Sequence, residues 1–157
     1  MNIQKIIILL STLSLMACGG RTAYYKYQPV PIDGWAADSV LTFTVPISDT
    51  TAAYDVLLHV RHTDAYPYQN MWMFISESPS TLNTKASQTD TIEFYLADDR
   101  GRWLGNGHSL KEMPVLYRQQ VHFTDSVYRL TIQQGMRDEA LKGISDIGLE
   151  LVKDGKR

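Results

Sequence analysis

Apolar and polar residues alternate along most of the chain, at the period of two that a half-buried β-strand requires. In the segment 39–45, Leu41, Phe43 and Val45 fall on one face and threonines fall on the other. The same alternation recurs in the segments 54–62, 90–97, 115–123, 127–134 and 147–152. Seven or eight short strands at regular spacing, with turn residues between them, predict an all-β domain built as an antiparallel β-sandwich or jelly roll.

Two segments depart from simple alternation. Residues 70–76, NMWMFIS, are apolar on both faces, which predicts a central strand covered on two sides with Trp72 in the core. Residues 136–144, MRDEALKGI, are the one stretch with a helical pattern, about two turns long, and Gly143 suits its end. We therefore expect a β-sandwich with one short helix near the C-terminus.

The start of the chain has a different character. Residues 6–16 are uncharged and mostly apolar, but a membrane-spanning helix needs about 20 such residues, so this run indicates a secretory signal. The sequence LMAC that ends at Cys18 resembles a bacterial lipobox, although Met16 is a looser fit than the usual small residue. Cys18 is the only cysteine and falls at the cleavage position, so we expect it to be acylated. The alternative is a buried N-terminal helix in which the cysteine is incidental.

These features divide the chain into three parts. Residues 1–17 are the expected signal peptide, 18–30 the acylated cysteine with a short tether, and 31–157 a single β-sandwich domain. Two or three acyl chains give a stable membrane anchor. No aspartate follows Cys18 and no acidic cluster is present next to it, which favours the periplasm-facing side of the outer membrane.

Charge and motifs exclude several classes of function. The 15 basic and 17 acidic residues give a net charge of −2, and without a basic patch we expect no nucleic-acid partner. His59 and His62 are three residues apart, which on a strand places them on opposite faces, so we expect no metal site. No nucleophile elbow or phosphate-binding glycine motif appears. We therefore expect no catalytic residue, no cofactor and no enzymatic activity.

The stretch LADDRGRWLGNGH, residues 96–108, is the busiest in the sequence. Its DDRG and GNG segments predict two turns, and Asp98 and Asp99, being neighbours, cannot face one another as paired catalytic carboxylates. Trp103 could be a stacking platform, with Asp98 and Arg102 as hydrogen-bonding neighbours. Tyr66 or Tyr68, from the tyrosine-rich segment 64–70, could share that rim. Trp103 could instead cover one end of the sandwich, and we favour this second interpretation.

Three motifs make the chain similar to a known family. They are N-[LM]-W, then D-T-x-E-x-x-L-A-D followed by G-x-W-x-G-x-G, and finally Q-x-M-R followed by L-x-G-I-x-D-[IV]-G. The matching residues are Asn70, Met71 and Trp72; Asp90, Thr91, Glu93, Leu96, Ala97, Asp98, Gly101, Trp103, Gly105 and Gly107; and Gln134, Met136, Arg137, Leu141, Gly143, Ile144, Asp146, Ile147 and Gly148. With the lipobox, they resemble the gliding-motility-associated lipoprotein GldH family of Bacteroidota over essentially the whole chain.

The resemblance implies an envelope lipoprotein linked to gliding and, by association, to the type IX secretion and cell-surface machinery of this phylum. It implies no activity, ligand or catalytic residue. Our leading hypothesis is a non-catalytic outer-membrane lipoprotein that acts through protein–protein contacts, with the membrane and unidentified envelope proteins as partners. The alternative is a glycan- or peptide-binding module with an aromatic rim.

The lipobox generates the first prediction. Replacing Cys18 with alanine should abolish metabolic lipid labelling and move the protein out of the membrane fraction, because no other cysteine can carry the acyl groups. Continued membrane association of an unprocessed chain would instead support an uncleaved signal anchor.

Overall fold

The computed structural model describes residues 21–79 and 88–154, and every regular element in them is a β-strand. The strands are β1 (Thr22–Pro29), β2 (Trp35–Ala36), β3 (Val40–Pro46), β4 (Ala53–His62), β5 (Asn70–Pro79), β6 (Gln88–Tyr95), β7 (Lys111–His122), β8 (Val127–Gln134), β9 (Ala140–Leu141) and β10 (Ile144–Lys153). The described residues contain no helix of the length and apolar character that crossing a membrane requires.

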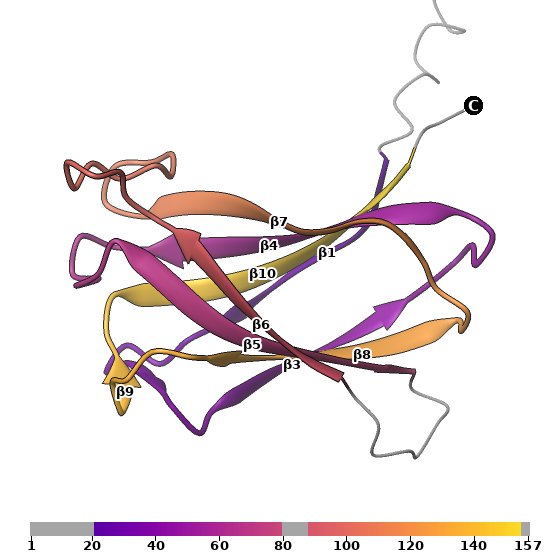
Figure 1. Cartoon of the computed structure of the whole chain (residues 1–157), viewed down its shortest axis with the longest axis horizontal. Coiled ribbons are helices and arrows are strands. Elements are labelled where there is room, and N and C mark those ends of the chain that lie inside the picture. The colour runs from indigo at the N-terminus through magenta and orange to yellow at the C-terminus, as the bar shows by residue number, and fades with distance from the viewer. Residues whose placement is uncertain (1–20, 80–87, 155–157) are drawn as a thin grey trace, which may run out of the picture.

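The strands form two four-stranded sheets and one short ribbon. The first sheet has the order β1-β10-β4-β7, the second has the order β3-β8-β5-β6, and β2 pairs with β9. All of these pairings are antiparallel. The two sheets lie face to face (Figure 1), which confirms the predicted β-sandwich.

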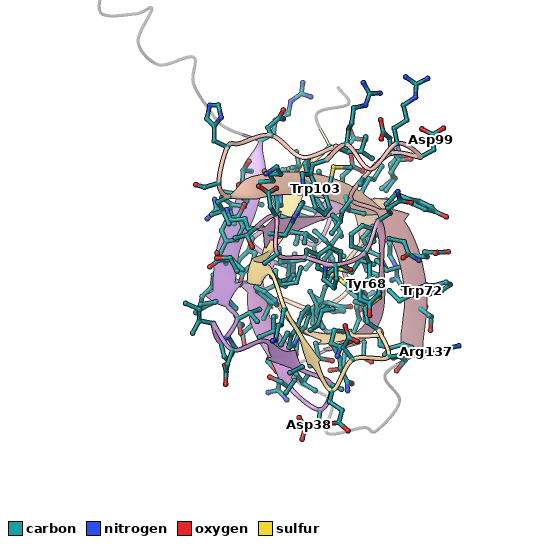
Figure 2. The ribbon with its side chains drawn as sticks, turned by 90° about the vertical axis from the view of Figure 1, so that its left-hand side faces the viewer. Asp38, Tyr68, Trp72, Asp99, Trp103 and Arg137 are labelled. Carbon is teal, nitrogen blue, oxygen red and sulfur yellow. The ribbon has the colours of Figure 1, made fainter. Side chains whose placement is uncertain are left out.

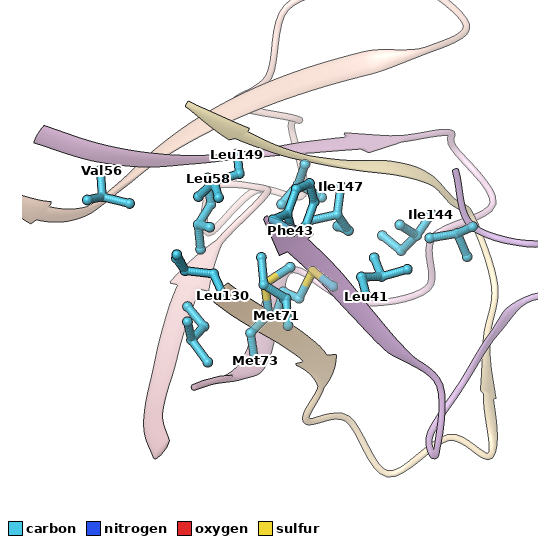
Figure 3. Close-up of a cluster of buried hydrophobic side chains, with 14 of the residues drawn as sticks. Leu41, Phe43, Val56, Leu58, Met71, Met73, Leu130, Ile144, Ile147 and Leu149 are labelled. Carbon is cyan, nitrogen blue, oxygen red and sulfur yellow. The ribbon is translucent and has the colours of Figure 1, made fainter. Parts of the chain in front are cut away.

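The alternation in the sequence produces the core directly. In β3, Leu41, Phe43 and Val45 are buried, while the residues between them face solvent. The inward side chains of β4, β5, β8 and β10 meet them between the sheets, as Figure 3 shows for Leu58, Met71 and neighbouring residues. Burying an aliphatic side chain of this size contributes roughly 1.5–3 kcal/mol, so this shared layer is the main force that holds the sheets together.

Strand β5 corrects one expectation. It is a central strand in the second sheet, but only one of its faces is covered. Met71, Met73 and Ile75 are fully buried, whereas Trp72 is 37% exposed and Phe74 is 39% exposed. The prediction that Trp72 belongs to the core is wrong, because no layer formed by residues 21–79 and 88–154 covers the outer face of this sheet.

The helix predicted for residues 136–144 is also absent. The buried side chain of Gln134 accepts a hydrogen bond from the backbone N–H of Met136 (2.7 Å) and donates one to the carbonyl of Asp138 (2.8 Å). These bonds hold the backbone in a bend. The Met136 N–H and the Asp138 carbonyl are bonded to the Gln134 side chain and not to other backbone groups of a helix. Leu141 then pairs with Trp35 in the β2–β9 ribbon and is fully buried.

Most of the expected tether is a strand instead. Residues 22–29 form β1, which pairs along its length with β10. Tyr27 lies opposite Gly148, and a Cβ atom on Gly148 would approach the Tyr27 ring to 2.6 Å. The Tyr27 ring therefore covers the backbone of Gly148, and β1 extends the first sheet by one strand. The sequence pattern did not predict this strand, because apolar and polar residues alternate only weakly in β1 and its outward residues include tyrosines. The expected signal peptide, residues 1–17, and Cys18 lie outside the described residues.

A polar clamp joins the two sheets on one side. Arg118 of β7 forms an ion pair with Glu77 of β5 (3.1 Å) and another with Asp90 of β6. Tyr117 also donates a hydrogen bond to Asp90 (2.7 Å). The hydrogen bonds from Tyr117 and Arg118 lower the pKa of Asp90, whereas burial raises the pKa of Glu77. Each carboxylate thus has Arg118 as a cationic partner, which helps to hold Asp90 in its charged form, whereas at Glu77 the cost of burial outweighs the attraction of Arg118.

The strand directions define two ends of the sandwich. Strands β1, β4, β6 and β8 all finish at one end, which also carries the long connections before β5, β7 and β10; we call it the loop end. It lies on the left in Figure 1. Thr22, the first residue of β1, lies at the opposite end, beside Val152. The candidate functional residues gather at the loop end.

The contact between Tyr27 and Gly148 can be tested by a double-mutant cycle. Gly148→Ala should lower the free energy of unfolding by about 1–3 kcal/mol, because the new methyl group has no space beneath the ring. Tyr27→Ala should relieve that clash, so the double variant should lose less stability than the sum of the single changes. Urea unfolding of the four proteins measures the coupling, and strictly additive losses would contradict this packing.

Candidate functional site

A groove at the loop end is the main candidate site. It encloses about 370 Å³ and is lined by Tyr68, Asn70, Trp72, Gly135, Met136 and Arg137. We call it the Trp72 groove. Figure 2 looks onto the loop end and shows the labelled Tyr68, Trp72 and Arg137. Segments 68–72 and 135–137, more than 60 positions apart in the sequence, supply its two sides.

Backbone pairing fixes the shape of this groove. The Gly135 N–H donates to the Trp72 carbonyl (2.7 Å), and the Trp72 N–H donates to the Met136 sulfur (3.3 Å). A Cβ atom on Gly135 would lie 3.2 Å from the Trp72 Cβ and 3.3 Å from Cε2 of Phe74. The missing side chain at position 135 therefore leaves the side of the Trp72 indole open.

Paired polar groups border the groove. Asn70 donates a hydrogen bond to Glu93 (2.6 Å), and the Tyr68 hydroxyl donates one to Asp138 (2.9 Å). The bond to Asp138 raises the pKa of Tyr68. Arg137 is exposed and has no ion pair with any residue in the described part of the chain. The groove thus combines an aromatic surface with hydrogen-bond donors and acceptors whose orientation is already fixed.

The aromatic residues considered for a rim around Trp103 pack on one another: Trp103 contacts Tyr66, and Tyr66 contacts Tyr68 with ring centroids 5.9 Å apart. Trp103 is half-buried, with its ring centroid 4.5 Å from that of His62 and 6.4 Å from that of Tyr66. Tyr66 is 2% exposed and its hydroxyl donates to the Asn70 carbonyl (2.7 Å). Of the two tyrosines proposed for the rim, only Tyr68 lines a groove, and that groove contains Trp72 instead of Trp103.

Asp98 and Arg102 stabilise a turn. One carboxylate oxygen of Asp98 accepts the backbone N–H groups of Arg100 (3.0 Å) and Arg102 (2.8 Å), and the other accepts the Arg102 guanidinium (2.8 Å). These contacts, the Arg102 backbone bond first, lower the pKa of Asp98. Gly101 has a φ of 76°, which suits glycine. The prediction of a turn at DDRG agrees with this geometry.

The two histidines of β4 lie on opposite faces, as the strand pattern predicts. On the outer face, His59 contacts Glu112 through Nδ1 (3.1 Å) and Glu150 through Nε2 (2.9 Å). Tyr27 donates a hydrogen bond to Glu112 (2.7 Å), so this cluster links β1 to β4, β7 and β10.

On the inner face, His62 is fully buried, and its Nε2 has no hydrogen-bond partner. Across the described ranges 21–79 and 88–154, no group of histidine, cysteine or carboxylate residues has an arrangement that could hold a metal ion.

The described chain is thus an all-β domain with a small aromatic and polar groove, and comparisons with known proteins identify its class. Residues 22–151 match the GldH lipoprotein family. The chain is 31% identical to the gliding motility lipoprotein GldH of Flavobacterium johnsoniae, with 92% of this chain and 93% of the relative covered. It is 30% identical to the gliding motility lipoprotein GldH homolog of Christiangramia forsetii, with coverage of 94% and 93%.

Among solved structures, Eiger TNF from S. frugiperda aligns with a TM-score of 0.35 and 10% identity, covering 85% of this chain and 94% of that one. That likeness carries no functional argument. The sequence matches, in contrast, define the class: a lipoprotein with a β-sandwich domain. The chain belongs to the GldH lipoprotein family.

The sequence did not predict the Trp72 groove as a site, although four residues that line this groove belong to the family motifs. Asn70 and Trp72 belong to the N-[LM]-W motif, and Met136 and Arg137 belong to the Q-x-M-R motif. Trp72 and Arg137 are exposed, so packing of the core does not explain their presence there. The sequence therefore singled out both segments by their motifs, but only the structure shows that Trp72 and Arg137 are exposed and lie in one groove.

The buried His62 predicts a specific dependence of stability on pH. Burial lowers the pKa of His62 from 6.5, so just below pH 6.5 the unfolded chain takes up a proton at this position that the folded protein does not. The folded state is therefore fully stabilised above about pH 6.5 and loses stability as the pH falls, by at most about 1.4 kcal/mol per pH unit.

His62→Phe keeps an aromatic ring beside Trp103 and removes this titration. The loss of unfolding free energy between pH 7.5 and pH 5 should be smaller in the variant than in the wild type, as measured by urea unfolding. Equal losses in both proteins would show that His62 does not contribute to the acid sensitivity.

Proposed function

We propose that this protein is an outer-membrane lipoprotein that faces the periplasm and supports gliding motility by binding other envelope proteins, without catalysing a reaction. The names of its relatives, both gliding motility lipoproteins, support the motility role. The partners we propose are components of the gliding and type IX secretion machinery, identified here by family resemblance alone.

The connection to the anchor supports a defined orientation. Thr22, where β1 begins, follows Cys18 by four residues, a reach of at most about 13 Å. The eight residues of β1 extend over about 26 Å, so an acylated Cys18 holds the Thr22 end near the membrane and points the loop end away from it. Partners in the aqueous compartment then meet the loop end first.

Exposed apolar side chains at the loop end are the observation that carries this proposal. Ile32 is fully exposed at a turn after β1, and Leu104 and Leu110 are 48% and 39% exposed in the connection between β6 and β7. Gly34 donates a backbone bond to Pro31 (3.0 Å), which holds Ile32 at the tip of its turn. All three side chains lie in connections at the loop end, and the fully exposed Ile32 is the one we propose for protein contact.

The polar groups support a non-catalytic role. Asp98 holds a turn, Asp90 and Glu77 join the sheets, and Glu112 and Glu150 hold His59. Each of these carboxylates therefore has a structural partner. None of these pairs combines a nucleophile with a base and an oriented third group, as catalysis of acyl transfer would require.

Site-specific photo-crosslinking in growing cells tests the proposal. A photoreactive amino acid at Ile32 should give discrete crosslinked products with envelope proteins. The same amino acid at His122, which is exposed at the opposite end on β7, should give far fewer. Comparable products from both positions, or none from Ile32, would contradict contact through the loop end.

A further inference from the structure

We propose that the Trp72 groove binds a neutral sugar unit of a glycan chain, a second activity separate from the protein contacts assigned to Ile32 and its neighbours. The proposal stands on the chemistry of three features: the aromatic surface, the mixture of donors and acceptors, and the charge around the groove.

The aromatic surface suits the apolar face of a pyranose ring. Trp72 and Phe74 are both exposed and lie two residues apart on β5, which places them on the same face of the sheet about 6.6 Å apart along the strand. Tyr95, 58% exposed on the neighbouring β6, pairs with Asn70 beside Trp72. Aromatic rings offer a large rigid surface at little entropic cost, and the C–H groups on one side of a sugar ring can stack on it.

Both donors and acceptors surround this surface, as a sugar hydroxyl requires. Asn70 and Arg137 present N–H donors, while Glu93 and Asp138 present carboxylate acceptors. The hydrogen bonds of Glu93 with Asn70 and of Asp138 with Tyr68 leave each carboxylate further lone pairs. Because the Asn70–Glu93 and Tyr68–Asp138 bonds already fix these groups, binding a sugar does not have to order them.

The local charge favours a neutral ligand over an acidic one. The residues that line the groove or hydrogen-bond to its lining include two carboxylates, Glu93 and Asp138, and one guanidinium, Arg137, so the border has no positive excess to attract a polyanion. Beyond the groove, the outer face of β5, β6 and β8 carries mainly hydroxyl and amide groups, among them Ser76, Thr91, Thr131 and Gln133. The apolar core of a protein interface has a different composition.

The size of the groove fits this assignment. A cavity of about 370 Å³ lies at the lower end of the range of small-ligand sites, roughly 300–1,000 Å³. We infer that one ring occupies the groove beside Gly135 and that the adjoining units extend over Trp72 and Phe74. The ligand is therefore a segment of a chain of neutral hexoses or N-acetylated hexosamines.

Two-dimensional NMR of the acylated full-length protein in a sugar-free detergent tests this directly. The three tryptophans provide an internal control, because Trp35 is fully buried, Trp103 packs on His62, and only Trp72 lies in the groove. Cellohexaose, maltohexaose, mannohexaose and chitohexaose are titrated separately, with hexagalacturonate as the acidic comparison. At least one neutral hexasaccharide should shift the Trp72 indole signal saturably while the other two indole signals stay in place.

Variants make the assignment specific. Trp72→Ala, followed through the backbone amide signals of Asn70 and Gly135 because its indole signal is lost, should abolish binding. Asn70→Ala should weaken binding about tenfold, or about 1.4 kcal/mol. Arg137→Gln, at an exposed position without an ion pair in the described chain, should also weaken binding without affecting folding. The matched control is Arg129→Gln, an exposed arginine of β8 outside the groove, which should bind as the wild type does.

Three results would each overturn the proposal: no neutral hexasaccharide shifts the Trp72 signal, hexagalacturonate binds equally well, or Trp72→Ala retains full binding. A peptide that shifts the Trp72 signal when no sugar does would assign the groove to protein contact instead. These outcomes are independent of crosslinking at Ile32, so failure of the glycan site and failure of the proposed function remain distinguishable.

Discussion

The pairing of β1 with β10 is the interaction on which the orientation of the whole domain depends. β1 is an edge strand with few inward apolar side chains, so its attachment relies on backbone hydrogen bonds, on Tyr27 covering Gly148, and on the bond from Tyr27 to Glu112. The strand also directly follows the expected lipid anchor. With the proposed anchor at Cys18, this pairing would set the direction of the domain, because the loop end lies about one strand length from the Thr22 end.

Different interactions stabilise the space between the two sheets and the outer face of the first sheet. Between the sheets, a continuous apolar layer contributes most of the stability, and the Arg118 clamp links the sheets on one side. Along the outer face of the first sheet, stability comes from a cluster in which His59 faces two carboxylates and Arg61 lies 3.7 Å from the Tyr27 ring centroid. Burial raises the pKa of Glu112, but the hydrogen bonds from Tyr27 and Arg61 outweigh it, and the net shift is downward. This polar cluster attaches β1 to its sheet, whereas the apolar layer holds the inner strands of the two sheets together.

The strands of the core could be predicted because period-two alternation reports directly on burial, as in Leu41, Phe43 and Val45. The errors share a physical cause: the sequence pattern does not show what lies opposite a given face. Trp72 and Phe74 lie in an apolar segment, yet both are partly exposed and no element of the described chain covers them. The MRDEALKGI segment has helical composition, but the Gln134 side chain binds its first backbone groups and the β2–β9 pairing takes Leu141. Long-range contacts overrode local preference in both places.

The Trp72 groove illustrates the same limit for function. Its two sides come from segments that adjoin only because β5 pairs with β8, so no local motif could reveal that Asn70 and Arg137 border one cavity. Trp103, the more conspicuous tryptophan in the sequence, is held by His62 and by a hydrogen bond to Asp64. Trp103 is packed on His62 and Tyr66, as the interpretation we favoured expects, whereas Trp72, predicted to lie in the core, is 37% exposed. Polar neighbours made Trp103 resemble a binding residue, and apolar neighbours made Trp72 resemble a core residue. A tryptophan on a strand is accessible to a ligand when the face of the sheet that carries it is uncovered. The arrangement of the strands determines which face that is.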